Sequence, residues 1–116
     1  MIITNSWKYS TNHTSKYHAK KTIVDDITFD SKKEAMRYQE LKLLQRAGEI
    51  ENLQLQVPYV LIEKSKHGRA IKYIADFVYE EKGQTVVEDS KGYRTDVYKL
   101  KKRLLAEKYD IEIKES

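Results

Sequence analysis

The stretch KYIADFVYEEKGQTVVEDSK, residues 72–91, decides the fold of this chain. Two runs rich in β-favouring residues flank the polar segment 81–84, which contains a glycine and is typical of a tight turn. The sequence therefore predicts a β-hairpin whose first strand ends near Tyr79 and whose second strand begins near Thr85.

Three charged side chains of this hairpin indicate chemistry. Asp76 interrupts an apolar strand, and a carboxylate in such a place costs free energy unless it is paired or coordinates a ligand. Because side chains alternate between the faces of a strand, Asp89 and Lys91 project from one face, about 7 Å apart, while Glu88 points to the other. We therefore expect two carboxylates and an ammonium group to lie together.

Such a group suits metal-assisted hydrolysis of a phosphodiester. Mg²⁺ usually binds through one or two protein carboxylates, several waters and a substrate phosphate. Asp76 and Asp89 would supply the oxygen ligands of Mg²⁺ or Mn²⁺, and Lys91 would orient or activate the attacking water.

The same residues also allow a structural interpretation. Asp89-Ser90-Lys91-Gly92 is an ordinary turn composition, since Asp and Ser bond their own backbone and Gly accepts a positive φ. Asp76 would then be a charge that protects an edge strand from aggregation.

Ala75-Asp76 and Asp89-Ser90-Lys91 together resemble the signature of the PD-(D/E)XK nucleases. From about residue 16 onwards the chain is similar to small phage-encoded proteins of that superfamily, and more distantly to phage Holliday-junction resolvases and transposon end-cutting nucleases. It departs from the signature in two places: Ala75 replaces the proline, and Asp89 is one methylene shorter than glutamate. The resemblance implies a restriction-endonuclease-like α/β core, with a mixed sheet flanked by two helices. It also implies a metal-dependent endodeoxyribonuclease that acts on branched or recombining phage DNA.

A helix is predicted over residues 31–47, because Ser31 and Glu34 match the capping box and Gly48 is a fitting stop. In the nucleases that the chain resembles, a glutamate on the first helix completes the acidic cluster. The resemblance therefore implies that Glu34 joins the two aspartates as a third metal ligand, and that Gln56 lies near the site. The alternative is that Glu34 only caps the helix.

The remaining strands complete an α/β pattern. Residues 22–29 predict two short strands around the turn pair Asp25-Asp26, and residues 49–62 predict a strand that Pro58 bends or places at an edge. Residues 110–113 are expected to add a short final strand. We expect a central mixed sheet of about three main strands plus the hairpin strands.

A second helix is predicted after the turn at Gly92, with Thr95 or Asp96 as its N-cap. Val97, Leu100, Leu104 and Leu105 predict its apolar side. The expected core of the protein is Tyr38, Leu41, Leu44, Leu55, Ile74, Phe77, Val86, Val87, Leu100 and Leu104.

Positive charge is concentrated in two regions. The first 22 residues hold four lysines and no acid, which equals the whole net charge of +4, so residues 1–21 are predicted to be a flexible basic arm ahead of a nuclease-like domain at 22–116. Residues 91–108 hold seven basic side chains and two acidic ones. Such clusters bind phosphates by counterion release, although a charged surface can also be merely solvated. The predicted DNA-binding residues are Lys20, Lys21, Lys66, Arg69, Arg94, Lys99, Lys102 and Arg103.

Length and composition limit the other possibilities. A chain of 116 residues with 40% apolar and 34% charged residues predicts one soluble domain. It has no cysteine, so disulfides and thiolate zinc sites are excluded, and no apolar run predicts a membrane span, which makes the cytoplasm the expected compartment. The resemblance to resolvases implies a homodimer. The alternatives to a nuclease are a non-catalytic DNA-binding module on the same fold and a structural or interaction domain of a phage particle.

Overall fold

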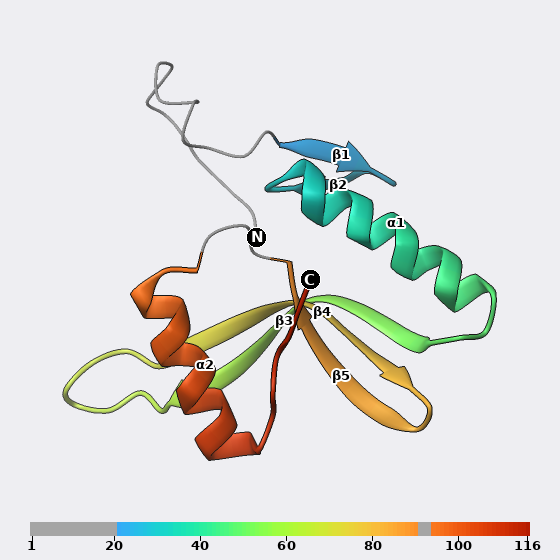
Figure 1. Cartoon of the computed structure of the whole chain (residues 1–116). Helices are drawn as coiled ribbons and strands as arrows, with labels where there is room; N and C mark the ends of the chain where they lie inside the picture. Colours follow the sequence, from blue (N-terminus) through green and yellow to red (C-terminus); the bar gives the residue numbers. More distant parts are fainter. Residues whose placement is uncertain (1–20, 91–93) are drawn as a thin grey trace.

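The structure, a computed structural model, describes residues 21–90 and 94–116 (Figure 1). The predicted arm up to Lys20 and the predicted catalytic Lys91 lie outside the described residues. Within the described ranges the elements are β1 (Thr22–Val24), β2 (Ile27–Phe29), α1 (Lys32–Arg46), β3 (Glu51–Ile62), β4 (Ile71–Glu81), β5 (Gln84–Asp89), α2 (Asp96–Tyr109) and β6 (Lys114–Glu115). No helix of these residues is long and apolar enough to cross a membrane.

Both predicted hairpins are present, and each has a two-residue turn with left-handed backbone. Asp25 and Asp26 have φ of 52° and 62°, and Lys82 and Gly83 have φ of 53° and 77°. Two consecutive positive φ values are typical of the turn whose twist matches that of the flanking strands. In the second hairpin this tight turn lets the strands extend beyond their predicted ends, to Glu81 and from Gln84.

The central sheet of the described residues has four strands in the order β3-β4-β5-β6. β3, β4 and β5 pair antiparallel, and β6 pairs parallel to β5, so the sheet is mixed. Pro58 lies on β3, which is an edge strand, as the sequence predicted. The first hairpin forms at the predicted residues, but as a separate two-stranded sheet beside α1 and not as part of the central sheet. The predicted position of the last strand was wrong. This strand is 114–115, because Asp110 ends α2 with φ of 58° and residues 111–113 return the chain to β5.

The two helices cover opposite faces of the sheet. Figure 1 shows α1 and α2 on opposite sides of the sheet. Phe77 and Tyr79 of β4 pack in the cluster that includes α1, whereas Val78 between them packs in the cluster that includes α2. We call these the α1 cluster and the α2 cluster. The α1 cluster consists of Phe29, Ala35, Tyr38, Leu41, Ile50, Phe77 and Tyr79. The α2 cluster consists of Leu61, Tyr73, Ala75, Val78, Val87, Tyr98, Leu105 and Ile113.

Along β4 the regular alternation of faces changes at Asp76. Residues two apart on a strand share a face, yet Tyr73 and Ala75 belong to the α2 cluster and Phe77 and Tyr79 to the α1 cluster. On β3 the residue opposite Asp76 has φ of 53°, which is unusual within a strand. Asp76 therefore lies where the strand passes from one helix to the other.

Most of the predicted core is confirmed. Four of its members are buried and four are partly buried against the clusters, but Ile74 is 48% exposed and Leu100 is 59% exposed. The predicted apolar side of α2 is confirmed for Leu104 and Leu105 and was wrong for Val97 and Leu100. The helix packs through Tyr98 and Leu105, which turns Val97 and Leu100 outward. Tyr98 supplies a large apolar ring at a position that an aliphatic pattern does not count.

Candidate active site

The two predicted aspartates meet through one backbone group. Asp76, 8% exposed, accepts a hydrogen bond on Oδ2 from the backbone N–H of Ser90, with the two atoms 2.9 Å apart. Ser90 directly follows Asp89, which ends β5 and is completely buried. The side chain of one predicted ligand is thus bonded to the residue next to the other, as the hairpin predicted.

Asp89 is held from both sides of its strand. Tyr73 OH donates to Asp89 Oδ2 at 2.5 Å, and the backbone N–H of Ser116 donates to the Asp89 carbonyl at 3.1 Å. Burial raises the pKa of Tyr73, and its contact with Asp89 raises it further, so the hydroxyl stays protonated and remains a donor. The Asp89 carboxylate is therefore fixed by β4, and the Asp89 backbone by the residue that follows β6.

Glu34 contacts Gln56, which lies opposite Asp76 on the neighbouring strand. Gln56 Nε2 donates to Glu34 Oε2 at 3.3 Å, and Gln56 stands opposite Asp76 in the β3–β4 ladder, between two pairs that are in register. The contact supports the prediction that Gln56 lies near the site. A cavity of about 80 Å³ adjoins this contact. It is lined by Ile27, Thr28, Phe29, Asp30, Glu34, Leu55 and Gln56.

The start of α1 has the predicted cap. Ser31 is the N-cap and accepts a hydrogen bond from the backbone N–H of Glu34 at 3.0 Å. The Glu34 carboxylate itself is 6% exposed and reaches Gln56 on the sheet. Ser31 therefore caps the helix, and the Glu34 side chain contacts the sheet.

The arrangement of acids limits how a metal ion would be held. Within residues 21–90 and 94–116, no three His, Cys, Asp or Glu side chains gather closely enough to form a metal-binding group. The structure brings Asp76 next to Asp89 through the Ser90 N–H. Glu34 contacts Gln56, which lies opposite Asp76. Two adjacent carboxylates fit the protein share of a Mg²⁺ site, because this ion keeps several waters and takes its remaining ligands from the substrate phosphate.

Glu88 lies on the opposite face from Asp89, as the alternation predicted, and its environment was not foreseen. Arg37 of α1 donates to both carboxylate oxygens, Nε to Oε2 at 2.5 Å and Nη2 to Oε1 at 3.0 Å, and Tyr79 OH donates to Oε1 at 2.6 Å. Burial would raise the pKa of Glu88, but the hydrogen bonds from Arg37 and Tyr79 outweigh it and lower the pKa. The only sequence feature that could have indicated this ion pair is Arg37 itself, a basic residue about one helical turn after Glu34.

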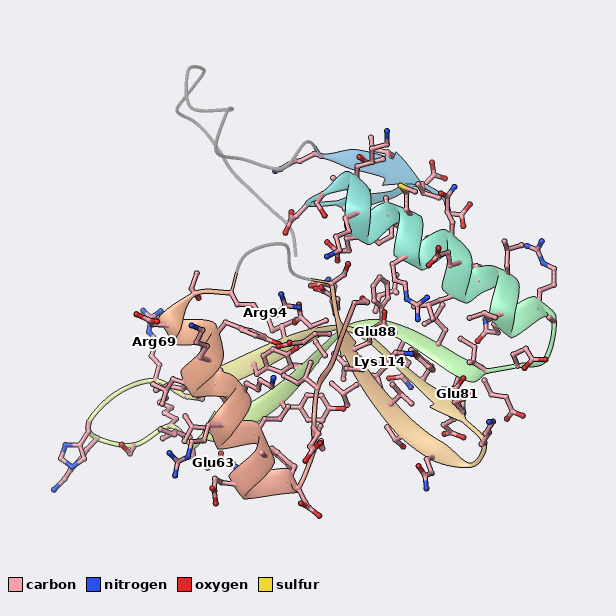
Figure 2. All side chains as sticks on the ribbon, in the orientation of Figure 1. Glu63, Arg69, Glu81, Glu88, Arg94 and Lys114 are labelled. Carbon is pink, nitrogen blue, oxygen red and sulfur yellow. The ribbon has the colours of Figure 1, made fainter. Side chains whose placement is uncertain are left out.

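The predicted DNA-binding residues divide into two groups. Lys21, Lys66, Arg69, Lys99 and Arg103 are exposed. Of these, Arg103 also forms an exposed ion pair with Glu107 at 3.8 Å. Arg94 and Lys102 pair with Glu115, at 3.0 and 3.1 Å, and Lys20 lies outside the described residues. Figure 2 shows Arg94, and also Glu88 and Lys114 at the centre, where β5 and β6 pair. Sequence reasoning missed Glu115 because it is 21 residues from Arg94.

An open groove runs beside the basic face of α2. It has a volume of about 400 Å³ and lies between α2 and the segment that leads into β6. Its lining residues are Lys99, Lys102, Arg103, Ala106, Ile111, Glu112 and Ile113. Lys102, which lines this groove, pairs with Glu115, whose partner in the β5–β6 ladder is Asp89.

Comparison with known proteins gives a family and no further relative. No curated protein and no solved structure matches the chain. A family model described as "Protein of unknown function (DUF1064)" matches residues 14–116, which includes the whole predicted domain and begins within the predicted arm. The chain therefore belongs to the DUF1064 family.

Proposed function

We propose that this chain is a metal-dependent endodeoxyribonuclease with a restriction-endonuclease-like core, and that Asp76 and Asp89 hold Mg²⁺ or Mn²⁺. The observation that carries the proposal is the hydrogen bond from the backbone of Ser90 to Asp76, which keeps two buried carboxylates on adjacent strands together. Buried carboxylates are costly, and a bound cation offsets that cost. Tyr73 supports the same role by orienting Asp89.

Each remaining residue has a role in this proposal. A divalent metal would lower the pKa of a water and neutralise charge on the phosphate. Glu34 would hold or orient a water ligand on the α1 side, where Gln56 fixes its carboxylate. Lys91 follows Asp89 by two residues and would position the attacking water. The resemblance to phage resolvases favours branched or recombining DNA as the substrate.

The basic groove on α2 supports DNA as the substrate class. Lys99 and Arg103 are exposed beside it, and it adjoins β6 and therefore the strand that ends at Asp89. Cations spaced along a groove bind a phosphate backbone without reading its sequence. Arg94 and Lys102 would contribute less to DNA binding, because Glu115 already neutralises them.

A non-catalytic DNA-binding module on the same fold is the second candidate. It is favoured by the finding that no three acids are gathered for a metal among residues 21–90 and 94–116. In this case the basic groove would bind DNA, and the aspartates would serve only to join β4 to β5.

A cleavage assay separates the two candidates. Labelled duplex, single-stranded, flap and four-way-junction DNAs are incubated with Mg²⁺, Mn²⁺ or EDTA and with wild type, Asp89→Asn or Lys91→Ala. Asp26→Asn is the matched control, because asparagine tolerates the left-handed turn at this exposed position. Metal-dependent cutting that both site variants lose and the control keeps would support the nuclease. Tight binding without cutting by wild type would favour the module.

A further inference from the structure

We propose that the ion pair between Arg37 of α1 and Glu88 of β5 is a positioning contact that sets where Glu34 lies relative to Asp76 and Asp89. This inference rests on the proposed metal site.

The Arg37–Glu88 pair is bidentate, with two parallel hydrogen bonds. Two guanidinium nitrogens of Arg37 donate to the two carboxylate oxygens of Glu88, and Tyr79 OH donates to one of the same oxygens. Glu88 has no exposed surface and Arg37 is only one-fifth exposed, so water competes weakly for these bonds. A planar fork against a carboxylate fixes orientation as well as distance. Glu40, on the exposed side of the same helix, also faces Arg37 at 3.0 Å.

Each partner of the pair lies beside a proposed site residue. Arg37 follows Glu34 by three residues, which is about 4.5 Å along the helix axis. Glu88 directly precedes Asp89 on β5. The contact therefore ties the segment that carries Glu34 to the segment that carries Asp89.

Two other polar contacts join α1 to the sheet: Gln56 Nε2 donates to Glu34 Oε2 at 3.3 Å, and the backbone N–H of Leu53 donates to Gln45 Oε1 at 2.9 Å. The first is a single long bond, and the second lies 11 residues from Glu34, near the other end of the helix. The rest of the contact belongs to the α1 cluster, whose apolar packing is non-directional and allows a helix to slide or rotate slightly. A buried ion pair is also a poor means of stabilising a fold, because desolvation of the two charges offsets much of their attraction. Its directional geometry is thus the property that a metal site would use.

The test removes the whole polar network at once. The triple variant Arg37→Met, Tyr79→Phe, Glu88→Leu leaves no member buried without a partner, and replacement of a buried ion pair by apolar residues of similar size is commonly tolerated. Mn²⁺ affinity is measured by electron paramagnetic resonance titration, the DNA cleavage parameters with a labelled substrate, and stability by urea unfolding. Glu63→Gln, which breaks an exposed ion pair with Lys108 far from the acids, is the matched control.

We expect the triple variant to bind Mn²⁺ about 10- to 100-fold more weakly, which is the range for partners that orient metal ligands. The turnover number kcat should fall with it, while the KM for DNA stays within about threefold, because the groove on α2 is unchanged. Glu63→Gln should match wild type. A folded triple variant with Mn²⁺ affinity and kcat within about twofold of wild type would overturn the inference.

A double-mutant cycle identifies the residue through which the pair acts. In a Glu34→Gln background, removal of the network should weaken Mn²⁺ binding no further, because the group being positioned is already lost. Equal weakening in both backgrounds would show a general structural effect and would also overturn the inference. If the triple variant does not fold, Arg37→Lys keeps the charge but loses the fork, and the same cycle is run with it.

Failure of the proposed function is distinguishable from failure of this inference. Wild type that binds Mn²⁺ and cuts no DNA removes the nuclease proposal, and the Mn²⁺ affinities of the variants still decide the positioning role. Wild type that does not bind Mn²⁺ overturns both.

Discussion

The Asp76 carboxylate lies 2.9 Å from the backbone nitrogen of Ser90, the residue after Asp89. Asp76 therefore has two separable functions. Its side-chain oxygen accepts a hydrogen bond that joins β4 to the end of β5, and an uncharged side-chain oxygen could accept the same bond. Its carboxylate also supplies a negative charge, which an amide would not. Substitutions that remove one property and keep the other test each function.

Asp76→Asn and Asp76→Ala should therefore differ in stability. Asparagine retains an oxygen that accepts the Ser90 N–H, whereas alanine leaves this buried donor unpaired, at a cost of about 1–3 kcal/mol. We expect the free energy of unfolding, measured with urea, to be clearly lower for Asp76→Ala than for Asp76→Asn. Both variants should lose Mn²⁺ binding. Equal stability of the two variants would contradict the structural role of the bond.

The two roles of the first turn of α1 are separated by two neighbouring variants. Ser31→Ala removes the N-cap and should reduce the free energy of unfolding by about 0.5–2 kcal/mol, with Mn²⁺ affinity unchanged. Glu34→Gln keeps the backbone bond to Ser31 and should weaken Mn²⁺ binding with a smaller loss of stability. Loss of stability alone in Glu34→Gln would leave this residue with a structural role only.

Glu115 makes stability depend on pH in the acidic range. Hydrogen bonds from Tyr98 and Lys102, and then from Arg94, lower its pKa from 4.5 to about 2. Because its pKa is lower in the folded state, Glu115 contributes stability fully above the unfolded pKa, and this contribution is lost as the pH falls from about 4.5 through about 2. The free energy of unfolding of Glu115→Gln, measured from pH 6 to pH 2, should fall less steeply than that of wild type. Parallel curves would refute this assignment.

The orientation of α2 predicts different effects on stability for Leu100 and Leu105, which the sequence pattern both placed on the apolar side of the helix. Leu105 is fully buried, so Leu105→Ala should cost about 2–5 kcal/mol. Leu100 is 59% exposed, and Leu100→Ala should change the free energy of unfolding by less than about 0.5 kcal/mol. Urea denaturation of both variants measures the difference, and a cost for Leu100→Ala comparable with that for Leu105→Ala would require another surface to cover this face.

Salt dependence tests the groove on α2. If Lys99 and Arg103 each contact a phosphate, Lys99→Ala and Arg103→Ala should weaken DNA binding and each reduce the slope of log affinity against log salt by about 1. The matched control is Lys82→Asn at the tip of the β4–β5 hairpin, where asparagine tolerates the positive φ. Unchanged slopes in both groove variants would exclude this surface from the DNA contact.

The sequence by itself determined the local structure. The turn pairs Asp25-Asp26 and Lys82-Gly83, the Ser31 and Thr95 caps and the edge position of Pro58 all depend on backbone preferences of a few neighbouring residues. The pairing of Asp76 with the end of β5 followed in the same way. A hairpin fixes the register of its strands, so two acids on it have a predictable separation.

Only the tertiary structure decided which distant groups meet. Arg37 and Glu88 are 51 residues apart, and Glu115 reaches Arg94 and Lys102 only because the last strand returns to β5. The rotation of α2, which exposes Leu100, also depends on which face fits the sheet. Such contacts depend on how whole elements pack, and a local pattern fixes the elements without fixing their packing. The two acids of the candidate site were therefore predictable, and the network proposed to position them was not.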